Sequence, residues 1–131
     1  EICLSDWSSD VCSSDLDCQR VELERLGPLI EHDPLFPQRV NVNVATVESR
    51  SRIRLRVWER GVGETRACGT GACATAIGAM RRGLADRRVT VSLAGGDLTI
   101  EWTAEGRILM TGPAAISFTG SFDSADYGVA L

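Results

Sequence analysis

The segment that most restricts the fold runs from Ala67 to Met80, because small or apolar residues occupy nearly every position in it. As a helix of about three turns it would have no polar face, and helices that are apolar on all sides are buried. Cationic residues and a glycine follow at Arg81, Arg82 and Gly83, which is typical of a helix C-terminus. We therefore predict a helix that begins within about two residues of Gly71 and is buried on all faces.

The sequence predicts a sheet around this helix. Short segments in which apolar and polar residues alternate, separated by turn residues, are typical of a strand meander. The predicted strands are residues 40–44, 53–57, 89–93, 98–102, 108–110 and 115–118. Apolar residues at near-helical spacing over residues 21–30 predict a further helix, which Gly27-Pro28 weakens. The expected fold is a strand-rich α+β domain curved around one buried central helix, with roughly five strands or more against that helix.

The first sixteen residues do not share these patterns. Residues 6–16 repeat Ser-Ser-Asp without helical or strand periodicity, and they resemble the in-frame translation of a common DNA sequencing adapter. A natural, flexible Ser/Asp-rich terminus is the alternative. We expect residues 1–18 to be a non-native or disordered leader, residues 19–122 to form the domain, and residues 123–131 to be a loose tail. Cys3 and Cys12 then carry no function, and Cys18 is assigned no role.

Composition excludes several classes of protein. A net charge of −4 with scattered arginines gives no footprint for nucleic acid, and Arg52, Arg54 and Arg56 are interpreted as the solvated side of one strand. All 14 basic residues are arginine, so this chain cannot form a lysine Schiff base with pyridoxal phosphate. No apolar run reaches the roughly 18–20 residues that cross a bilayer, and no export signal is visible, so we expect a cytoplasmic protein without membrane contacts.

The cysteines are expected to be free thiols. Their number, five, is odd and their spacing is irregular, which argues against a disulfide framework, and no spacing matches a metal site. Cys68 lies where the predicted helix begins, and the N–H groups and partial positive charge of a helix N-terminus favour a thiolate there. The same N–H groups can bind a carboxylate, so the loop pairs a base with an anion site. The alternative for Cys68 is a free cysteine that packs at a helix start. Cys73, five residues later, is interpreted as a core residue on the alanine face of the helix.

The run from Trp58 to Cys73 closely resembles the signature around the second catalytic cysteine of diaminopimelate epimerases: Trp-Glu-Arg-Gly-Val-Gly-Glu-Thr-Arg-Ala-Cys-Gly-Thr-Gly-Ala-Cys. Residues 26–30, 36–41 and 110–114 also look like the C-terminal half of that family, and the resemblance extends over residues 21–122. It implies one half of a two-domain fold. It also implies an isomerase that needs no cofactor or metal and interconverts LL- and meso-diaminopimelate for lysine and peptidoglycan precursor synthesis.

The resemblance also implies a role for individual residues. In this family two cysteines face opposite sides of the substrate α-carbon, and Cys68 would be one of the pair, acting as base in one direction and acid in the other. Gly69 and Thr70 would offer backbone amides to the reacting α-carboxylate. The residues that would hold the distal amino-acid end are Asn41, Glu59 and Arg60. Glu59 would in addition tune the acidity of the catalytic thiol.

The family's other catalytic cysteine belongs to an N-terminal half that this sequence does not contain. We therefore expect a truncated enzyme that is inactive alone, whose partners are diaminopimelate and the missing half; a homodimer is compatible with the full-length protein. One alternative is a proline racemase-like or related isomerase, which shares the Cys-Gly-Thr-Gly core, although Glu59 and Arg60 suit a second charged substrate head. The other alternative is a non-catalytic binding domain on the same scaffold, in which Cys68 is incidental.

Overall fold

A computed structural model describes residues 2–4, 10–13, 17–123 and 126 of the chain. Three helices lie in these residues: the short 3-10 helix η1 (Cys18–Arg20), α1 (Leu23–Glu31) and α2 (Gly69–Arg81). The strands are β1 (Ile2–Leu4), β2 (Asp10–Ser13), β3 (Asn41–Ser49), β4 (Arg52–Glu59), β5 (Gly63–Thr65), β6 (Arg88–Leu93), β7 (Gly96–Trp102) and β8 (Ile108–Thr111). The described part of the chain is thus an α+β domain, as the sequence predicts.

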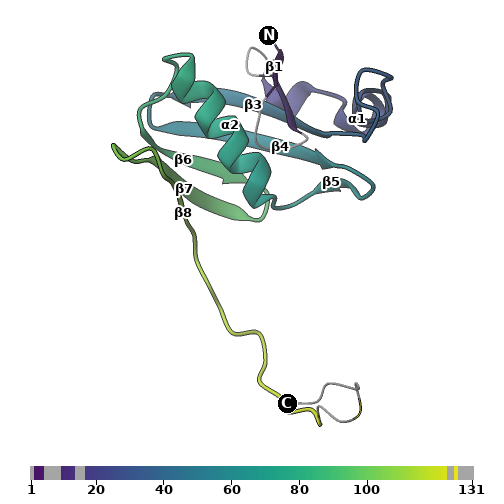
Figure 1. Cartoon of the computed structure of the whole chain (residues 1–131), viewed down its shortest axis with the longest axis vertical. Coiled ribbons are helices and arrows are strands. Elements are labelled where there is room, and N and C mark those ends of the chain that lie inside the picture. Colours follow the sequence, from purple (N-terminus) through teal and green to yellow (C-terminus); the bar gives the residue numbers. More distant parts are fainter. Residues whose placement is uncertain (1, 5–9, 14–16, 124–125, 127–131) are drawn as a thin grey trace.

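The described strands form one sheet in the order β1-β2-β3-β4-β6-β7-β8, and β5 pairs with β4 beside this path. Two pairs are parallel, β2 with β3 and β4 with β6, and parallel neighbours require a crossover connection. The first crossover contains α1 and the second contains α2, which lies across the strands in Figure 1. Along β4, Leu55 and Val57 pack with α2, whereas Trp58 packs with the cluster that contains Leu23 of α1. Because neighbouring strand residues point to opposite faces, the two helices cover opposite faces of the sheet.

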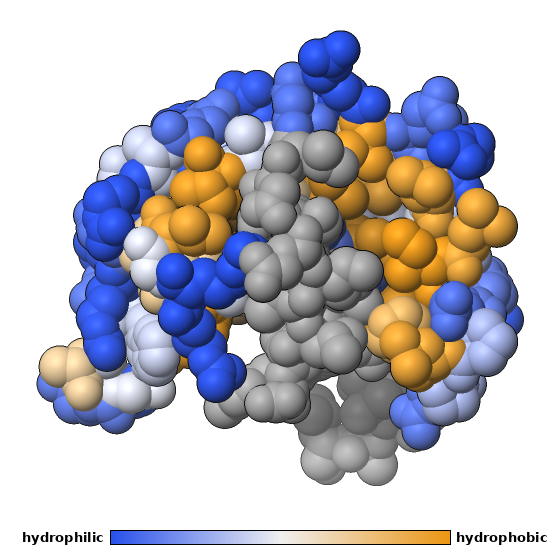
Figure 2. All heavy atoms as spheres, turned by 90° about the horizontal axis from the view of Figure 1, so that it is seen from above, coloured by the Kyte–Doolittle hydropathy of each residue, from blue (hydrophilic) through white to orange (hydrophobic). Residues whose placement is uncertain are grey.

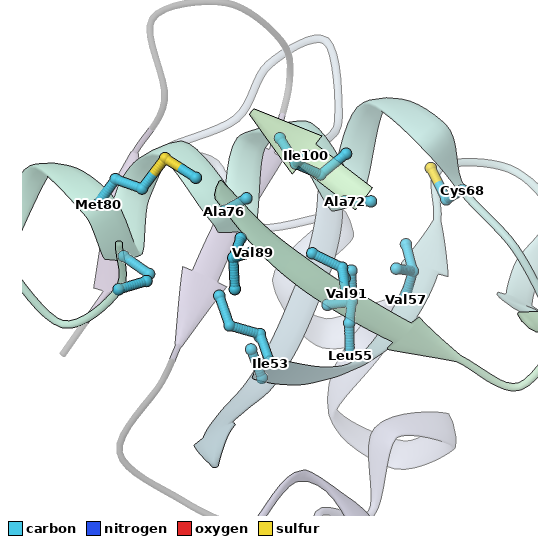
Figure 3. Packing of buried hydrophobic residues seen from close by; sticks show 13 residues of the cluster. Ile53, Leu55, Val57, Cys68, Ala72, Ala76, Met80, Val89, Val91 and Ile100 are labelled. Atoms are coloured by element: carbon cyan, nitrogen blue, oxygen red, sulfur yellow. The ribbon is translucent and has the colours of Figure 1, made fainter. Parts of the chain in front are cut away.

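The central helix α2 begins at Gly69 and ends at Arg81, which confirms its predicted position. It contacts β2, β3, β4, β6, β7 and β8, and Figure 3 shows the apolar side chains packed between the helix and the sheet. The prediction that α2 is buried on all faces is wrong along one stripe, where Thr70 and Arg81 are exposed and Cys73 and Ile77 are half-buried. These positions recur every three or four residues and therefore share the side of the helix that faces away from the sheet.

The helix α1 confirms the helical pattern that begins at residue 21, and Pro28 lies within it without ending it. Its buried residues, Leu23, Gly27 and Glu31, are four positions apart and form one stripe against the sheet. Gly27 permits the close approach of helix and strand, because a Cβ atom there would overlap the indole ring of Trp58.

The strands β3, β4, β6, β7 and β8 confirm five of the six predicted strands. The sixth prediction, residues 115–118, is wrong: residues 112–123 have no regular structure and leave the domain as an extended segment (Figure 1). Ile116 and Phe118 alternate as strand residues do, but they are 85% and 87% exposed. An alternating pattern becomes a strand only where a neighbouring strand pairs with it, and the described residues provide none there.

The arginines of β4 do not all lie in solvent. Arg52 and Arg54 are exposed, as predicted. Arg56 is half-buried, and its guanidinium donates hydrogen bonds to the carbonyl oxygens of Cys18 and Val21, each at 2.8 Å, and to Glu64 at 2.8 and 2.9 Å. The interpretation of Arg56 as a solvated residue is therefore wrong, because the chain around η1 lies over it.

Part of the N-terminal segment joins the edge of the sheet. β1 pairs with β2, and β2 runs parallel to β3. The expectation of a leader without structure is therefore not met at residues 2–4 and 10–13, since the open edge of a strand pairs with backbone of almost any sequence. The non-native origin of this segment stays a prediction, and Trp7, whose burial would test it, lies outside the described residues. Cys18 is fully buried, and its amide donates to Thr46 Oγ1 at 2.8 Å.

The surface combines polar and apolar areas. Figure 2 shows hydrophobic residues in two areas inside a hydrophilic rim. The exposed large hydrophobic residues include Leu35 and Val62, both in loops, and single residues of this kind are common on soluble domains. In the described part of the chain, none of the helices is both long and apolar enough to cross a membrane.

Candidate active site

Cys68 is the N-cap residue of α2, between β5 and the first helical turn. Its backbone is extended (φ −145°, ψ 107°), and its sulfur accepts a hydrogen bond from the Gly71 amide at 3.4 Å. The Thr70 hydroxyl lies 3.5 Å from the same sulfur. The sulfur of Cys68 therefore has one amide donor and one hydroxyl group as polar neighbours. The side chain is 8% exposed.

The first turn of α2 also supplies free amide donors. The first hydrogen bond of the helix runs from the Ala72 amide to the Cys68 carbonyl at 3.0 Å. The amides of Gly69 and Thr70 precede that bond and therefore have no acceptor within the helix. With the helix dipole behind them, two amides in this position have the arrangement that binds anions at helix N-termini in general.

Gly71 keeps this turn compact. A Cβ atom at residue 71 would lie 2.7 Å from Asn43 Oδ1, 3.3 Å from the Cys68 sulfur and 3.4 Å from Val57. Asn43 is fully buried on β3 and cannot easily move aside. Any side chain at residue 71 would therefore displace the cap that holds Cys68.

A pocket of about 770 Å³ opens beside Cys68. The residues at its Cys68 end are Glu59, Ala67, Gly69 and Thr70, and the exposed stripe of α2 forms one wall. Trp102, Ile108 and Met110, from β7 and β8, form another part of the lining. The pocket therefore joins a polar end around the thiol to a longer apolar surface along the helix.

Glu59 lies at the end of β4 and lines the pocket together with Cys68. Its Oε1 atom accepts a hydrogen bond of 2.5 Å from the Thr65 hydroxyl of β5. This bond links the two strands of the β4–β5 hairpin and holds the carboxylate on the side of the thiol. The structure thus brings together four of the six residues named from the sequence: Cys68, Gly69, Thr70 and Glu59.

Asn41 and Arg60 lie next to each other, but neither lines the pocket. The Arg60 amide donates to Asn41 Oδ1 at 2.8 Å, and the Arg60 guanidinium donates to the Gln38 carbonyl at 3.0 Å. These bonds connect the turn after β4 to the chain that enters β3. Arg60 directly follows Glu59, which lines the pocket, and Asn41 is hydrogen-bonded to Arg60. Both residues therefore lie beside the pocket lining without belonging to it.

Cys73 lines the same pocket one turn further along α2 and is half-buried. Burial raises the pKa of its thiol, and the nearby charge of Cys68 raises that pKa further. At neutral pH the protonated form of Cys73 is therefore favoured. Among the described residues, no group of three or more histidine, cysteine, aspartate or glutamate side chains is arranged to hold a metal ion.

Sequence reasoning missed Glu31. This carboxylate is 3% exposed, and it accepts hydrogen bonds from the Trp58 indole at 2.8 Å and from the Gly61 amide at 2.9 Å. The Arg39 guanidinium lies 3.6 Å away. The signal was present in the sequence, since Glu31 follows Leu23 and Gly27 at four-residue spacing on the buried stripe of α1. A charged residue on such a stripe requires buried partners.

Comparison with known proteins gives a consistent result. The sequence model of the family Diaminopimelate epimerase matches residues 11–117. The diaminopimelate epimerase of Erythrobacter litoralis is 62% identical over 111 residues, which are 85% of this chain and 41% of that protein. The diaminopimelate epimerase of Rhizorhabdus wittichii is 63% identical over 108 residues, 82% of this chain and 39% of that protein. The chain thus spans about two fifths of the length of these curated relatives.

Among solved structures, the PhzF-family phenazine biosynthesis protein of Bacillus anthracis superposes with a TM-score of 0.54. The match covers 81% of this chain and 36% of that one, at 19% sequence identity. At this identity the similarity concerns the fold.

Proposed function

Because the chain belongs to the diaminopimelate epimerase family, we propose that it carries one of the two acid/base groups of an enzyme that interconverts LL- and meso-diaminopimelate without a cofactor. The observation that carries this proposal is the position of Cys68. One helix start supplies both a cysteine sulfur, which accepts the Gly71 amide, and two amides free to bind a carboxylate. Removal of the proton next to a carboxylate requires this combination.

The reaction begins with the substrate α-carboxylate on the Gly69 and Thr70 amides. The Cys68 thiolate takes the α-proton and becomes a thiol, and the electron pair of the broken C–H bond spreads onto the carboxylate. The amides and the dipole of α2 stabilise this additional negative charge, because they already point at the oxygen atoms that receive it. Protonation from the opposite face by a second acid inverts the carbon. In the reverse direction Cys68 is the acid.

The distal end of the substrate carries a second ammonium and a second carboxylate. Glu59 suits the ammonium, and Arg60 with Asn41 suits the carboxylate. Support comes from the hairpin geometry, because Glu59 lines the pocket and the Arg60 amide is bonded to Asn41. Glu59 is also the carboxylate that would adjust the acidity of the Cys68 thiol.

The second acid/base cysteine would come from the part of the relatives that this chain does not span. That N-terminal half would also cover the exposed stripe of α2, so we expect the pocket beside Cys68 to be more open here than in the whole enzyme. The chain alone is then inactive, since one thiol cannot serve both faces of the α-carbon. The whole enzyme would act in the cytoplasm, and a homodimer is compatible with this arrangement.

The test is proton–deuteron exchange at the α-carbon of diaminopimelate in D₂O. The N-terminal part of the Erythrobacter litoralis relative, joined to residue 17 of this chain, gives a rebuilt enzyme. We expect activity only in the rebuilt enzyme, with Cys68→Ala reducing exchange by about 10³-fold and Cys73→Ala by less than about threefold. Full exchange in Cys68→Ala together with loss of exchange in Cys73→Ala would show that Cys73, and not Cys68, is the catalytic thiol. Full exchange in both variants would remove the epimerase proposal.

A further inference from the structure

The turn that carries Glu59 and Arg60 has little apolar packing of its own. Arg60, Gly61 and Val62 are exposed, and Val62 is 74% exposed. A Cβ atom added at Gly61 would meet nothing within 4 Å. Apolar contacts therefore do not fix the position of this turn, and its polar contacts must do so.

Glu31 provides two of these contacts from the opposite side of the hairpin. One carboxylate oxygen accepts the Gly61 amide at 2.9 Å, and the other accepts the Trp58 indole at 2.8 Å. Trp58 precedes Glu59 in the sequence, and Gly61 follows Arg60. The planar carboxylate of Glu31 therefore holds the chain on both sides of the Glu59–Arg60 pair. Arg39, 3.6 Å from Glu31, belongs to the loop whose Gln38 carbonyl accepts the Arg60 guanidinium.

Stability alone does not explain a carboxylate at this position. Glu31 is 3% exposed and belongs to the buried stripe of α1, which also contains Leu23 and Gly27. Burying a carboxylate carries a desolvation penalty, and well-packed hydrophobic residues often replace buried ion pairs without loss of stability. A glutamine side chain in the same position would place an NH₂ donor where one of the two carboxylate oxygens now accepts, so one of the two N–H groups would lose its acceptor.

We infer that Glu31 is a positioning residue: it holds the turn from which Glu59 and Arg60 bind the distal amino-acid head, and it thereby sets the preference for substrates that carry this head. The inference rests on the proposed function of the Cys68 site and adds to it a determinant of substrate specificity. Glu31 acts through Gly61 and Trp58 and does not touch the substrate.

The first test uses the chain itself and needs no substrate. Amide hydrogen exchange is measured at Gly61 in the wild type, in Glu31→Gln and in Glu22→Gln, a control that removes an exposed carboxylate paired with Arg25 beside the same helix. We expect Glu31→Gln to accelerate exchange of the Gly61 amide by about tenfold or more, because it weakens the bond to that amide, and Glu22→Gln to leave it unchanged. Equal protection of Gly61 in all three proteins would overturn the inference.

The second test measures substrate preference in the rebuilt enzyme. Exchange at the α-carbon is compared for diaminopimelate and for 2-aminopimelate, which lacks the distal ammonium. In Glu31→Gln we expect KM for diaminopimelate to rise about tenfold, kcat to change less than about threefold, and the preference for diaminopimelate to fall about tenfold. Trp58→Phe removes one of the two donors and should shift the preference in the same direction by about threefold, which keeps the test valid if Glu31→Gln folds poorly.

The outcomes are distinct. A lower kcat with unchanged KM and unchanged preference would overturn the inference, since Glu31 would then act at the reacting carbon. An unchanged preference in both variants would also overturn it. A wild-type rebuilt enzyme that shows no exchange at the α-carbon would contradict the proposed function instead. The amide exchange of Gly61 needs no substrate, so it still tests the role of Glu31 in that case.

Discussion

The two faces of the sheet bury different kinds of side chain. On the α2 face the buried residues are almost all apolar, and Figure 3 shows Leu55, Val57, Val91 and Ile100 packed against the alanines of the helix. On the α1 face, apolar residues surround charged groups, above all Glu31 and Arg56, which hold neighbouring segments by hydrogen bonds. The difference shows a division of labour: apolar packing fixes the helix that carries Cys68, and buried charges fix the turns beside it.

The largest loss of stability is expected when an apolar side chain on the α2 face is truncated. Leu55 is 2% exposed and points toward α2, so Leu55→Ala removes a buried isobutyl group and leaves a cavity. We expect a loss of about 3 kcal/mol in the free energy of unfolding, measured by urea denaturation. Leu35→Ala, at a residue that is 72% exposed, is the control and should cost less than about 0.5 kcal/mol. Similar losses in both variants would mean that the α2 face is not the main source of stability.

A smaller effect is expected from the charged face. Arg56→Met keeps much of the side-chain volume but removes the guanidinium donor of the Cys18 carbonyl and leaves the Val21 carbonyl with the Leu23 amide alone. We expect a loss of about 2 kcal/mol in the free energy of unfolding. Arg54→Met is the matched control, because Arg54 is on the same face of β4 but its ion pair with Glu48 is at the surface, and it should cost less than about 0.5 kcal/mol. Equal losses would show that Arg56 acts only through its general charge.

The same division explains what could be predicted from the sequence. Periodicity and small residues predicted α2, five strands and the position of Cys68, because local pattern decides those features. The strand prediction for residues 115–118 failed because a strand also needs a neighbouring strand to pair with, and the local sequence pattern does not show whether one is present. The prediction that α2 is buried on all faces failed for a related reason. Apolar side chains at Cys73 and Ile77 indicate that this side of the helix contacts another surface, but the sequence does not show whether that surface belongs to this chain.

The charged face was harder to predict. Arg56 looks identical to Arg52 and Arg54 in the sequence, and only the chain around η1, packed over it, makes it different. Glu31 was detectable as a carboxylate on a buried stripe, but its partners come from a hairpin some thirty positions away. Asn41 and Arg60 were assigned to the site through family resemblance alone, and their mutual hydrogen bond could not be derived from spacing.

The pH dependence of stability should also separate the faces. The hydrogen bond from the Trp58 indole is the main reason that the pKa of Glu31 lies below its ordinary value. A carboxylate with a lowered folded-state pKa stabilises the fold above its unfolded pKa, and this contribution disappears as pH falls through the folded-state pKa. We expect the difference in unfolding free energy between the wild type and Glu31→Gln to be largest near neutral pH and to shrink below about pH 4. Urea denaturation at pH 7, 5 and 3 measures it, and a difference that grows toward acid would contradict the assigned direction.

The smallest effect concerns the two thiols of the α2 face. Burial raises the pKa of Cys73, and the charge of Cys68 adds to that increase. Replacing Cys68 by alanine removes the charge but leaves the burial, so the pKa of Cys73 should fall only part of the way toward that of a free cysteine. The measurement is the rate of iodoacetamide alkylation of Cys73 against pH, followed by mass spectrometry of its peptide. Cys18→Ala is the control, because Cys18 is buried in the separate cluster on the α1 face and should leave the Cys73 profile unchanged. A Cys73 profile that is identical in the wild type and in Cys68→Ala would show that the two thiols do not interact, and the apolar face would then tune its cysteines by burial alone.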